Sequence, residues 1–573
     1  MAATASYNFV SLPPRILPAE VRNESSVEKT VKAYCEHVAS KGKLSGYIDL
    51  EITAKSPLFI GTEMGNCEFF APAGKKIIPG STLRGMAKNI MKIVTAGAMR
   101  CTKEDADFND KQLYFRTMAG SGRIREAYVN ELVINKRDSE NHWYSETKAT
   151  AGYLLHNEVE DRYYMCPTNF KRVNDPRSRV REISGAILWD DAKNQGKVAC
   201  FTGKMPFGRT AKKHYTVHGS LNLSKKEELP ADVVEAYKND ITRDEKLDIF
   251  KLGLKGEKAR EFAGEEYDFV CPCFYLKKDG AIKHFGFGQY YRIPYEKTIK
   301  DHVPAELQES TIDFTDMLFG KKEQWGSRLA FEDAEIQSEG EDVEAGEIKP
   351  LLEPKPTSFQ LYLAQAQAQG GTAANWNDDV PIRGYKMYWH QAGADWRGHT
   401  DNENLRSVIR PVGKDANFRG KIRFERLSEV ELGALAKVFA LAVKDGELCY
   451  KVGKGKSLGL GSIRIEPSLV VYDEKENYSN LFMEGALNLA SEEKGSEGIL
   501  EYAQIFDAYL KEEFTERERA RYDISQRELA AMLSWANTEK PEWKEKIRMM
   551  SIEDKDKPFQ NRFILPTAMQ VVR

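Results

Sequence analysis

A glycine turn that opens a basic amphipathic helix constrains this chain more than any other stretch. The turn is Pro79-Gly80, and Ser81 is expected to cap the helix that follows. One helical face is apolar, at Leu83, Met86, Ala87, Ile90 and Val94, and the other is basic, at Arg84, Lys88 and Lys92. Because a helix start presents backbone N–H groups and a positive dipole end, this one favours a phosphate. The alternative is an ordinary helix with a solvated basic face.

The residues before this turn predict a half-buried strand. Within Leu44–Phe59, apolar and polar residues alternate, with Ile48, Leu50 and Ile52 on one side. A loop rich in glycine and aromatic residues, Gly61–Gly74, then leads to the turn. Strand, long loop and helix form the opening of a ferredoxin-like β-α-β-β-α-β unit.

A second block supplies the other half of such a unit. Phe418–Phe424 reads as a strand whose one face carries Arg419, Lys421 and Arg423, and these cations are expected to face solvent or an anion. Ser428 and Glu431 then form a capping box before a helix over Leu432–Val443. Ser462–Ile465 reads as the closing strand.

The glycine loop between that helix and the closing strand, Gly453–Gly461, fits neither common nucleotide-binding motif. A Walker A motif needs glycine where Tyr450 stands, and the dinucleotide motif needs its third glycine where Leu458 stands. Four glycines interspersed with Lys454, Lys456 and Ser457 still allow backbone amides to approach a phosphate closely. The alternative is a plain glycine-rich turn.

Length and composition define the class of protein. A chain of 573 residues is expected to hold two or three domains, or one domain with large insertions. The net charge of −3 neither supports nor excludes nucleic acid, because basic and acidic segments are segregated. Eight irregularly spaced cysteines do not form a disulfide framework. Without a secretory segment or a long apolar run, a cytoplasmic protein with no membrane partner is expected.

The predicted class is α+β, with five regions. An extended N-terminal segment (1–43) precedes the first half of the unit (44–130), and the second half (311–470) precedes a mainly helical C-terminal region (471–573). Between the halves, residues 131–310 are expected to be insertions on the same sheet scaffold rather than a separate fold. Strands are expected at Gly185–Trp189, Val198–Thr202, Tyr267–Leu276 and Gln289–Ile293, a basic loop or hairpin at Lys204–His218, and a mobile acidic loop at Glu335–Gly346.

Several motifs in a fixed order resemble one known family. The strand end Pro57–Gly61, the turn and helix at Ile78–Gly85 and the terminal glycine loop resemble the RAMP superfamily of CRISPR-associated RNA-binding proteins. Met317–Gly320 followed by Ser327–Ala334 resembles an element of its backbone subunits. Two further stretches resemble large RAMP proteins encoded with type III systems, Pro354–Phe359 and Arg383–His390.

This resemblance implies a modified RNA-recognition-like ferredoxin fold, in one module or two, and a role in antiviral defence. Subunits of this family stack along a guide RNA (crRNA) in a ribonucleoprotein complex, and a β-hairpin thumb separates guide from target RNA. The implied partners are both RNAs, neighbouring RAMP subunits and the large catalytic subunit, and RNA binding needs no cofactor. We expect RNA contacts at Gly80, Ser81, Arg84, Lys88, Lys212, Lys213, Arg383, Lys386, Arg419, Lys421, Gly453, Lys454, Gly455, Lys456 and Ser457.

Two alternative functions remain open. One is an endoribonuclease that cuts target or precursor guide RNA. Related subunits cut with an aspartate and a divalent metal in the loop after the first strand, but Gly61–Lys76 offers only Glu63 and Glu68. His390, or His214, is a candidate general acid or base for guide processing. The other alternative is a protein-interaction module without RNA contact.

A zinc site is the remaining metal hypothesis. Cys271, Cys273 and His284, with His214 or His218, offer the right ligand types, but the C-x-C spacing is tighter than that of common structural sites. The alternative is a pair of buried free cysteines.

Overall fold

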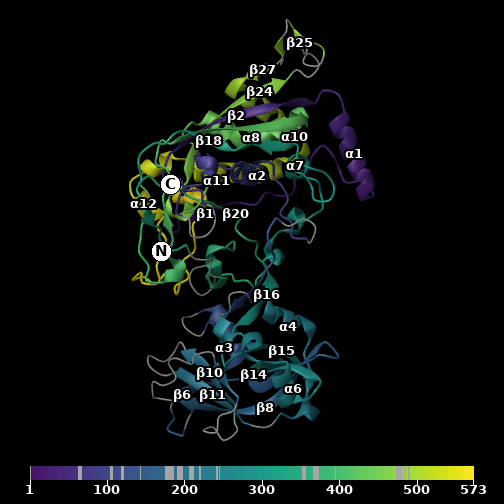
Figure 1. Cartoon of the computed structure of the whole chain (residues 1–573), viewed down its shortest axis with the longest axis vertical. Helices are drawn as coiled ribbons and strands as arrows, with labels where there is room; N and C mark the ends of the chain where they lie inside the picture. Colours follow the sequence, from purple (N-terminus) through teal and green to yellow (C-terminus); the bar gives the residue numbers. More distant parts are fainter. Residues whose placement is uncertain are drawn as a thin grey trace.

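The computed structural model describes residues 2–61, 67–102, 107–117, 122–137, 139–141, 143–174, 186–189, 198–204, 212–218, 221–240, 243, 245–351, 356–365, 373–393, 395–472, 479, 482–483, 486–487 and 491–573. The chain is of the mixed α+β class, as predicted, with several antiparallel sheets. Figure 1 shows two bodies, an upper one that holds both termini and a lower one built from the middle of the chain.

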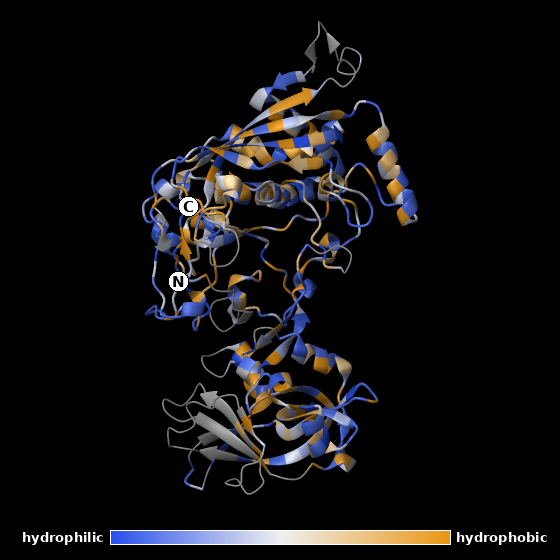
Figure 2. Cartoon of the chain, viewed as in Figure 1, coloured by the Kyte–Doolittle hydropathy of each residue, from blue (hydrophilic) through white to orange (hydrophobic). Residues whose placement is uncertain are grey.

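The upper body is organised by an antiparallel sheet with the strand order β23-β24-β2-β22-β18-β3. Two short strands extend it, because β17 pairs with β22 and β27 pairs with β24. Its strands are β2 (Leu44–Ala54), β3 (Ile77–Ile78), β17 (Leu329–Phe331), β18 (Ala334–Ser338), β22 (Asn417–Leu427), β23 (Tyr450–Lys451), β24 (Ser462–Tyr472) and β27 (Ser491–Lys494). The two strands predicted from alternation are confirmed as β2 and β22, and the closing strand predicted at Ser462–Ile465 is confirmed as the longer β24. The alternation of hydrophobic and hydrophilic residues along these strands is visible in Figure 2.

Helices cover one face of this sheet (Figure 1). The helix α2 (Gly80–Val94) lies in the chain between β2 and β17, and α8 (Glu429–Lys444) lies between β22 and β24. They pack against each other and, together with α7 (Phe314–Phe319) and α10 (Gly495–Glu513), bury one continuous hydrophobic core under the sheet. The chain therefore runs strand, helix, two strands, helix, strand, and its central strand order is β24-β2-β22-β18.

The two crossing helices begin differently. The capping box predicted for α8 is confirmed, since Ser428 Oγ accepts from the Glu431 N–H at 3.0 Å and the Glu431 carboxylate accepts from the Ser428 N–H at 2.9 Å. The cap predicted at Ser81 is wrong. The helix α2 starts one residue earlier at Gly80, with Pro79 in the cap position, because the turn itself places Gly80 in the first helical turn.

The N-terminal segment is extended only in part. The strand β1 (Tyr7–Val10) pairs with β20 (Tyr385–Tyr388), so this stretch docks as predicted. The prediction of an extended segment over 1–43 missed α1 (Val27–Ala39), whose start is capped by Ser26. This helix has few buried residues, and its Tyr34 ring stacks on the distant Trp325 ring at 4.2 Å.

The C-terminal region is mainly helical, as predicted. It contains α10, α11 (Glu516–Leu533), α12 (Trp543–Lys546) and α13 (Ala568–Val571), besides the short hairpin of β25 (Phe482–Met483) and β26 (Ala486–Leu487). The helix α11 packs against α2 and β1 beneath the helical layer. No helix in the described part of the chain is both long and apolar enough to cross a membrane.

The lower body has its own antiparallel sheet, with the order β13-β14-β7-β8-β11-β10-β9, and its own hydrophobic core. Residues 131–310 therefore do not simply extend the first sheet as predicted, and the second core already includes Phe115 and Ile124. The strands of this body are β5 (Val133–Arg137), β6 (Trp143–Thr147), β7 (Thr150–Asn157), β8 (Arg162–Asn174), β9 (Ala186–Leu188), β10 (Val198–Lys204), β11 (Lys212–His218), β12 (Glu227–Glu228), β13 (Leu254–Lys255), β14 (Tyr267–Lys278) and β15 (Ala281–Gly286), and its helices are α3 (Arg123–Leu132), α4 (Ala231–Lys238), α5 (Ile249–Leu252) and α6 (Glu257–Ala263).

The remaining strand predictions need two corrections. The strand expected at Gln289–Ile293 is β16 (Ile293–Thr298), which pairs with β4 (Gln112–Phe115) and lies between the two bodies in Figure 1. The mobile loop expected at Glu335–Gly346 instead begins with β18, which is paired on both sides, with β22 and β3. The acidic residues of this segment predicted disorder. The start of the segment is ordered as a strand because it pairs with β22 and β3, which lie far from it in the sequence.

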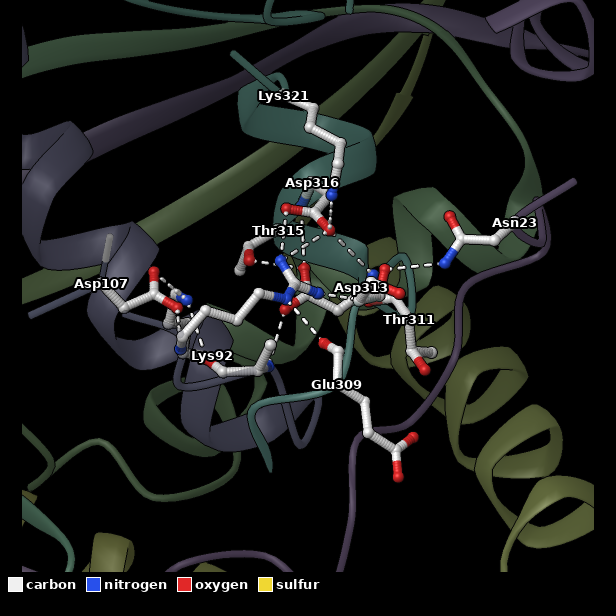
Figure 3. Close-up of polar contacts among 12 residues, drawn as sticks. Asn23, Lys92, Asp107, Glu309, Thr311, Asp313, Thr315, Asp316 and Lys321 are labelled. Atoms are coloured by element: carbon white, nitrogen blue, oxygen red, sulfur yellow. Dashed lines mark hydrogen bonds and ion pairs between the residues drawn. The ribbon is translucent and has the colours of Figure 1, made fainter. Parts of the chain in front are cut away.

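A buried polar cluster ties α2 to α7 (Figure 3). The Arg100 Nη1 lies 3.1 Å from Asp316 Oδ2, and Asp313 Oδ2 accepts from the Ala98 N–H at 2.7 Å. Lys92, predicted to lie on a basic surface stripe, is instead largely buried here, where it donates to Ala98 O at 2.9 Å and pairs with Asp107. Burial alone would raise the pKa of Asp313, but the charges of Lys92 and Arg100 and its hydrogen bonds keep that pKa below the ordinary value.

A second buried ion pair joins α8 to the segment that precedes β17. The Arg328 guanidinium contacts both carboxylate oxygens of Glu431, with Nη1 2.9 Å from Oε2, and His37 Nε2 lies 3.4 Å from Oε1. Glu431 is fully buried. Burial would raise its pKa, but hydrogen bonds from His37 and Arg328 and the charge of Arg328 outweigh this effect and lower the pKa to about 2.

The Glu431 ion pair predicts acid lability. A folded pKa of about 2 against an ordinary value of 4.5 means that the charged carboxylate stabilises the fold above pH 4.5, and that this stabilisation is lost as the pH falls toward 2. At about 1.4 kcal/mol per pKa unit, the full loss is about 3 kcal/mol, and about 2 kcal/mol of it has occurred by pH 3. Urea denaturation between pH 7 and pH 3 measures this part. A free energy of unfolding that stays flat over this range would contradict the assignment.

Candidate nucleic-acid interface

The glycine loop requires its glycines. Gly453, Gly455, Gly459 and Gly461 all have positive φ angles, between 75° and 91°. A Cβ at Gly461 would lie 1.9 Å from Val452 O, and one at Gly453 would lie 2.4 Å from Phe59 O. Only glycine therefore fits both the backbone conformation and the space at these two positions.

The loop is fastened to the end of β2. The Lys454 N–H donates to Phe59 O at 3.0 Å and the Gly461 N–H donates to Pro57 O at 2.9 Å. Between these anchors, Lys456–Leu458 forms one short turn of 3₁₀-helix. The N–H groups of Gly455, Lys456 and Ser457 make no hydrogen bond to another described residue. Gly455 is buried and the other two residues are half-buried, so the turn offers adjacent donors chiefly at Lys456 and Ser457.

The lysines of the loop differ in their surroundings. Lys454 is exposed, with its ammonium 3.1 Å from Ser407 Oγ. The Lys456 ammonium donates to Gly453 O at 2.9 Å, and burial lowers its pKa. Sequence reasoning missed Lys451, which donates to Leu460 O at 3.0 Å and whose pKa burial lowers to about 7. Lys454 is thus the loop cation that faces outward.

The segment around Ser407 adds exposed arginine to this surface. The Arg410 N–H donates to Cys67 O at 2.7 Å, which holds the segment against the loop that follows β2. The Arg410 Nε lies 3.4 Å from Glu68 Oε1, and both side chains are more than half exposed. Glu68 therefore lies beside Arg410, in the segment whose Ser407 contacts Lys454, whereas Glu63 lies outside the described residues. The sequence shows that the segment around Arg410 is basic, but it does not show that this segment lies beside Lys454 and Glu68.

An acidic side chain of the same chain occupies the start of α2. The Gly80 N–H, predicted to meet a phosphate, donates to Asp333 Oδ1 at 2.7 Å, and a Cβ at Gly80 would lie 2.1 Å from Phe331 O. A carboxylate thus takes the place expected for an external anion. Arg84 donates to Phe319 O at 2.9 Å, at the end of α7.

Ser81 and Lys88 lie apart from these contacts. Ser81 is exposed in the first turn of α2, and Lys88 is partly exposed farther along the helix. Lys88 makes no ion pair within the described ranges. Of the basic stripe predicted on α2, this leaves Lys88 as the cation without a fixed partner.

The three cations predicted on one face of β22 each lie near an acidic side chain. Lys421 lies 3.5 Å from Asp49 and 3.7 Å from the centre of the Tyr47 ring, and Arg419 lies 4.0 Å from the same carboxylate. Arg423 lies 2.5 Å from Glu332. Because acids of neighbouring strands meet these cations, the basic stripe of β22 does not form a positive surface by itself.

Arg383 and Lys386 hold the chain termini together. Arg383 donates to Pro566 O at 3.2 Å, and burial lowers its pKa to about 10. The Lys386 ammonium lies 4.0 Å from the centre of the Tyr7 ring. Their contacts in this structure are therefore within the chain.

His390 is a core histidine. It is 1% exposed, its Nδ1 lies 2.9 Å from Ser462 Oγ and its Nε2 lies 3.1 Å from Cys449 O. Burial holds its pKa well below the ordinary value, so the ring is neutral at pH 7. A general acid or base must reach its substrate, and this ring lies beneath the surface with both nitrogens in use.

The hairpin predicted around Lys204–His218 is present, because β10 and β11 pair antiparallel in the lower sheet. Lys212 and Lys213 begin β11, and their side chains, like that of His214, lie outside the described residues. The tip of this hairpin lies outside them too.

Among the described residues, the proposed zinc ligands Cys271, Cys273 and His284 do not form a metal-binding cluster. Cys271 and Cys273 are fully buried in β14, where burial raises the pKa of both thiols, and His284 lies 2.9 Å from Tyr291 OH. Among the described His, Cys, Asp and Glu side chains, the one group with ligand atoms within 4.8 Å of one another is Glu20, His37 and Glu431. Neutral buried thiols agree with the alternative of free core cysteines.

No family model matches the chain, and no curated protein sequence does. The geometry brings together one surface at the end of β2, which we call the loop surface. It comprises the 455–457 turn with its N–H donors, Lys454, Arg410 and Glu68. Free amide donors beside exposed cations are the groups that bind phosphate oxygens.

Proposed function

We propose that this chain is a guide-RNA-binding backbone subunit of a type III CRISPR effector complex and a member of the RAMP superfamily. The observation that carries the proposal is the placement of the glycine loop. It immediately precedes the strand β24 of a sheet whose chain order is β-α-β-β-α-β and whose central strand order is β24-β2-β22-β18. That order is the one expected of the ferredoxin-like unit to which the sequence motifs belong.

The chemistry of the loop surface suits a backbone of variable sequence. Guide RNAs differ in their bases, so a subunit that binds any guide must contact phosphates rather than base edges. The N–H groups of Gly455, Lys456 and Ser457 and the side chains of Lys454 and Arg410 offer such contacts. In this proposal, the residues around the α2 start maintain the scaffold, and the loop surface meets the RNA.

Binding is favoured over cleavage by the surroundings of the named residues. His390 is buried, and the Glu68 carboxylate lies beside Arg410. Metal-assisted cleavage through Glu68 would need that carboxylate to hold a divalent cation, and its pairing with Arg410 disfavours this. The proposed partners are guide and target RNA, neighbouring RAMP subunits and the large catalytic subunit, in the cytoplasm.

Salt-dependent RNA binding tests the proposal. Fluorescence anisotropy with a labelled single-stranded RNA of CRISPR-repeat sequence is measured between 50 and 300 mM KCl. Each phosphate neutralised by a lysine or arginine contributes a slope of about −0.7 in a plot of log K against log salt, so the two contacts expected from Lys454 and Arg410 give a slope of about −1.4. An interaction module without RNA contact would give no salt-sensitive affinity.

A further inference from the structure

A cavity in the lower body has an unusual lining. It holds about 260 Å³ and lies beside β15 and α4. Its wall carries four cationic residues, Arg116, Arg243, Lys283 and Arg292, together with a group of aromatic rings that includes Tyr237 and Phe285. Among its described lining residues there is no carboxylate.

Two of the guanidinium groups, those of Arg243 and Arg292, are held in fixed positions. The Arg243 guanidinium lies 3.4 Å from the centre of the Tyr237 ring, which also stacks on the Phe285 ring at 4.6 Å. Arg292 donates to Tyr114 O at 3.1 Å, and its Nε lies 3.3 Å from Asp240 Oδ2. Such fixed guanidinium groups bind an anion with little loss of conformational freedom.

The balance of charge is positive toward the cavity. Asp240 and Asp248 lie within 3.9 Å of Arg243, and Glu131 lies 3.9 Å from Lys283, but none of these acids lines the wall. Arg116 is exposed and makes no ion pair within the part of the chain described. Four cations against three acids behind the wall leave a net positive charge, and burial lowers the pKa of Arg292, as expected for a cation short of solvent.

We propose that this cavity binds one nucleoside phosphate unit, with the phosphate on Arg116 and Arg292 and the base against the aromatic wall. Arginine forks recognise phosphate, and aromatic rings offer apolar faces and edges to a base. The volume lies just below the usual range of about 300–1,000 Å³ for ligand sites, which suits a single nucleotide. The ligand is either a free nucleotide or the 5′-phosphorylated end of an RNA.

Calorimetric titration with the four ribonucleoside 5′-monophosphates tests this site on the full-length protein. At least one is expected to bind, and the corresponding nucleoside and ribose 5-phosphate are expected to bind at least about 10-fold more weakly. The two sources are separated by comparing 5′-phosphorylated with 5′-hydroxyl RNA of the same sequence. A preference for phosphorylated RNA over the free nucleotide assigns the RNA end, and the reverse assigns the free nucleotide.

Variants of the wall locate the binding. Arg116→Gln is expected to weaken nucleotide binding at least about 10-fold, and Arg116→Lys, which keeps the charge but loses the fork, is expected to have a smaller effect. Arg162→Gln is the control, because Arg162 is an exposed arginine of the same body that does not line the cavity. Binding equal in Arg116→Gln and the wild type, or no binding of any monophosphate and no effect of the 5′-phosphate, would overturn the proposal. Loop-surface variants are expected to leave nucleotide binding unchanged, so the two proposals fail separately.

Discussion

Replacing Glu431 by alanine is expected to lower the free energy of unfolding by about 3–5 kcal/mol, the usual effect of removing one partner of a buried ion pair. Arg328 is 8% exposed at its side chain and would remain charged without its carboxylate. The same change also removes the acceptor of the Ser428 N–H, the half of the α8 capping box that Glu431 supplies. Urea denaturation at pH 7 measures the difference from the wild type.

Glu429→Ala is the matched control for this variant. Glu429 lies in the first turn of the same helix and is exposed, so its loss removes only a favourable interaction with the helix dipole, about 0.3–1 kcal/mol. The double variant Arg328→Met/Glu431→Leu is expected to be more stable than Glu431→Ala, because it removes both charges together. If Glu431→Ala and Glu429→Ala lose equal stability, the ion pair does not support the fold as described.

Charge reversal on the loop surface is expected to have the largest effect on RNA. Lys454→Glu with Arg410→Glu replaces two expected phosphate contacts by repulsion, and we expect RNA affinity to fall about 100-fold at 100 mM salt. The slope of log K against log salt is expected to shrink by about 1.4, from two lost contacts of about 0.7 each. Anisotropy with the same labelled RNA provides both values.

The control for charge reversal makes the same change in net charge elsewhere. Lys511→Glu with Arg521→Glu alters exposed residues of α10 and α11 that form no ion pair with any residue in the described ranges. Non-specific repulsion would weaken RNA binding equally in both double variants. A loss confined to the loop-surface variant locates the RNA at the end of β2, and equal losses would contradict that location.

Local patterns in the sequence predicted much of the upper body. Alternation defined β2 and β22, and the Ser428 capping box fixed the start of α8, because each of these signals lies within a few residues of the structure it predicts. The helix α1 was not predicted, because it docks through Tyr34, which stacks against Trp325 from a distant part of the sequence. The lower sheet was equally hard to foresee, because its strands are assembled from separate stretches.

The candidate site was predicted less completely than the fold. The glycines of the loop carried a local signal, and their positive φ angles agree with it. The contacts of the basic residues could not be predicted, because the sequence does not show which group a lysine or arginine will pair with. Arg84 meets Phe319 O, Lys421 meets Asp49 and Lys92 enters a buried cluster, and each of these partners comes from another element.

The nucleic acid that purifies with the protein tests its role most directly. The chain is produced together with the products of its neighbouring genes, the assembly is isolated through a tag on this chain, and the bound nucleic acid is extracted and sequenced. The account predicts repeat-derived RNA of defined length, present with the wild type and depleted with Lys454→Glu/Arg410→Glu. Nucleic-acid-free assemblies, or RNA without repeat sequence retained equally by both proteins, would contradict the guide-binding role.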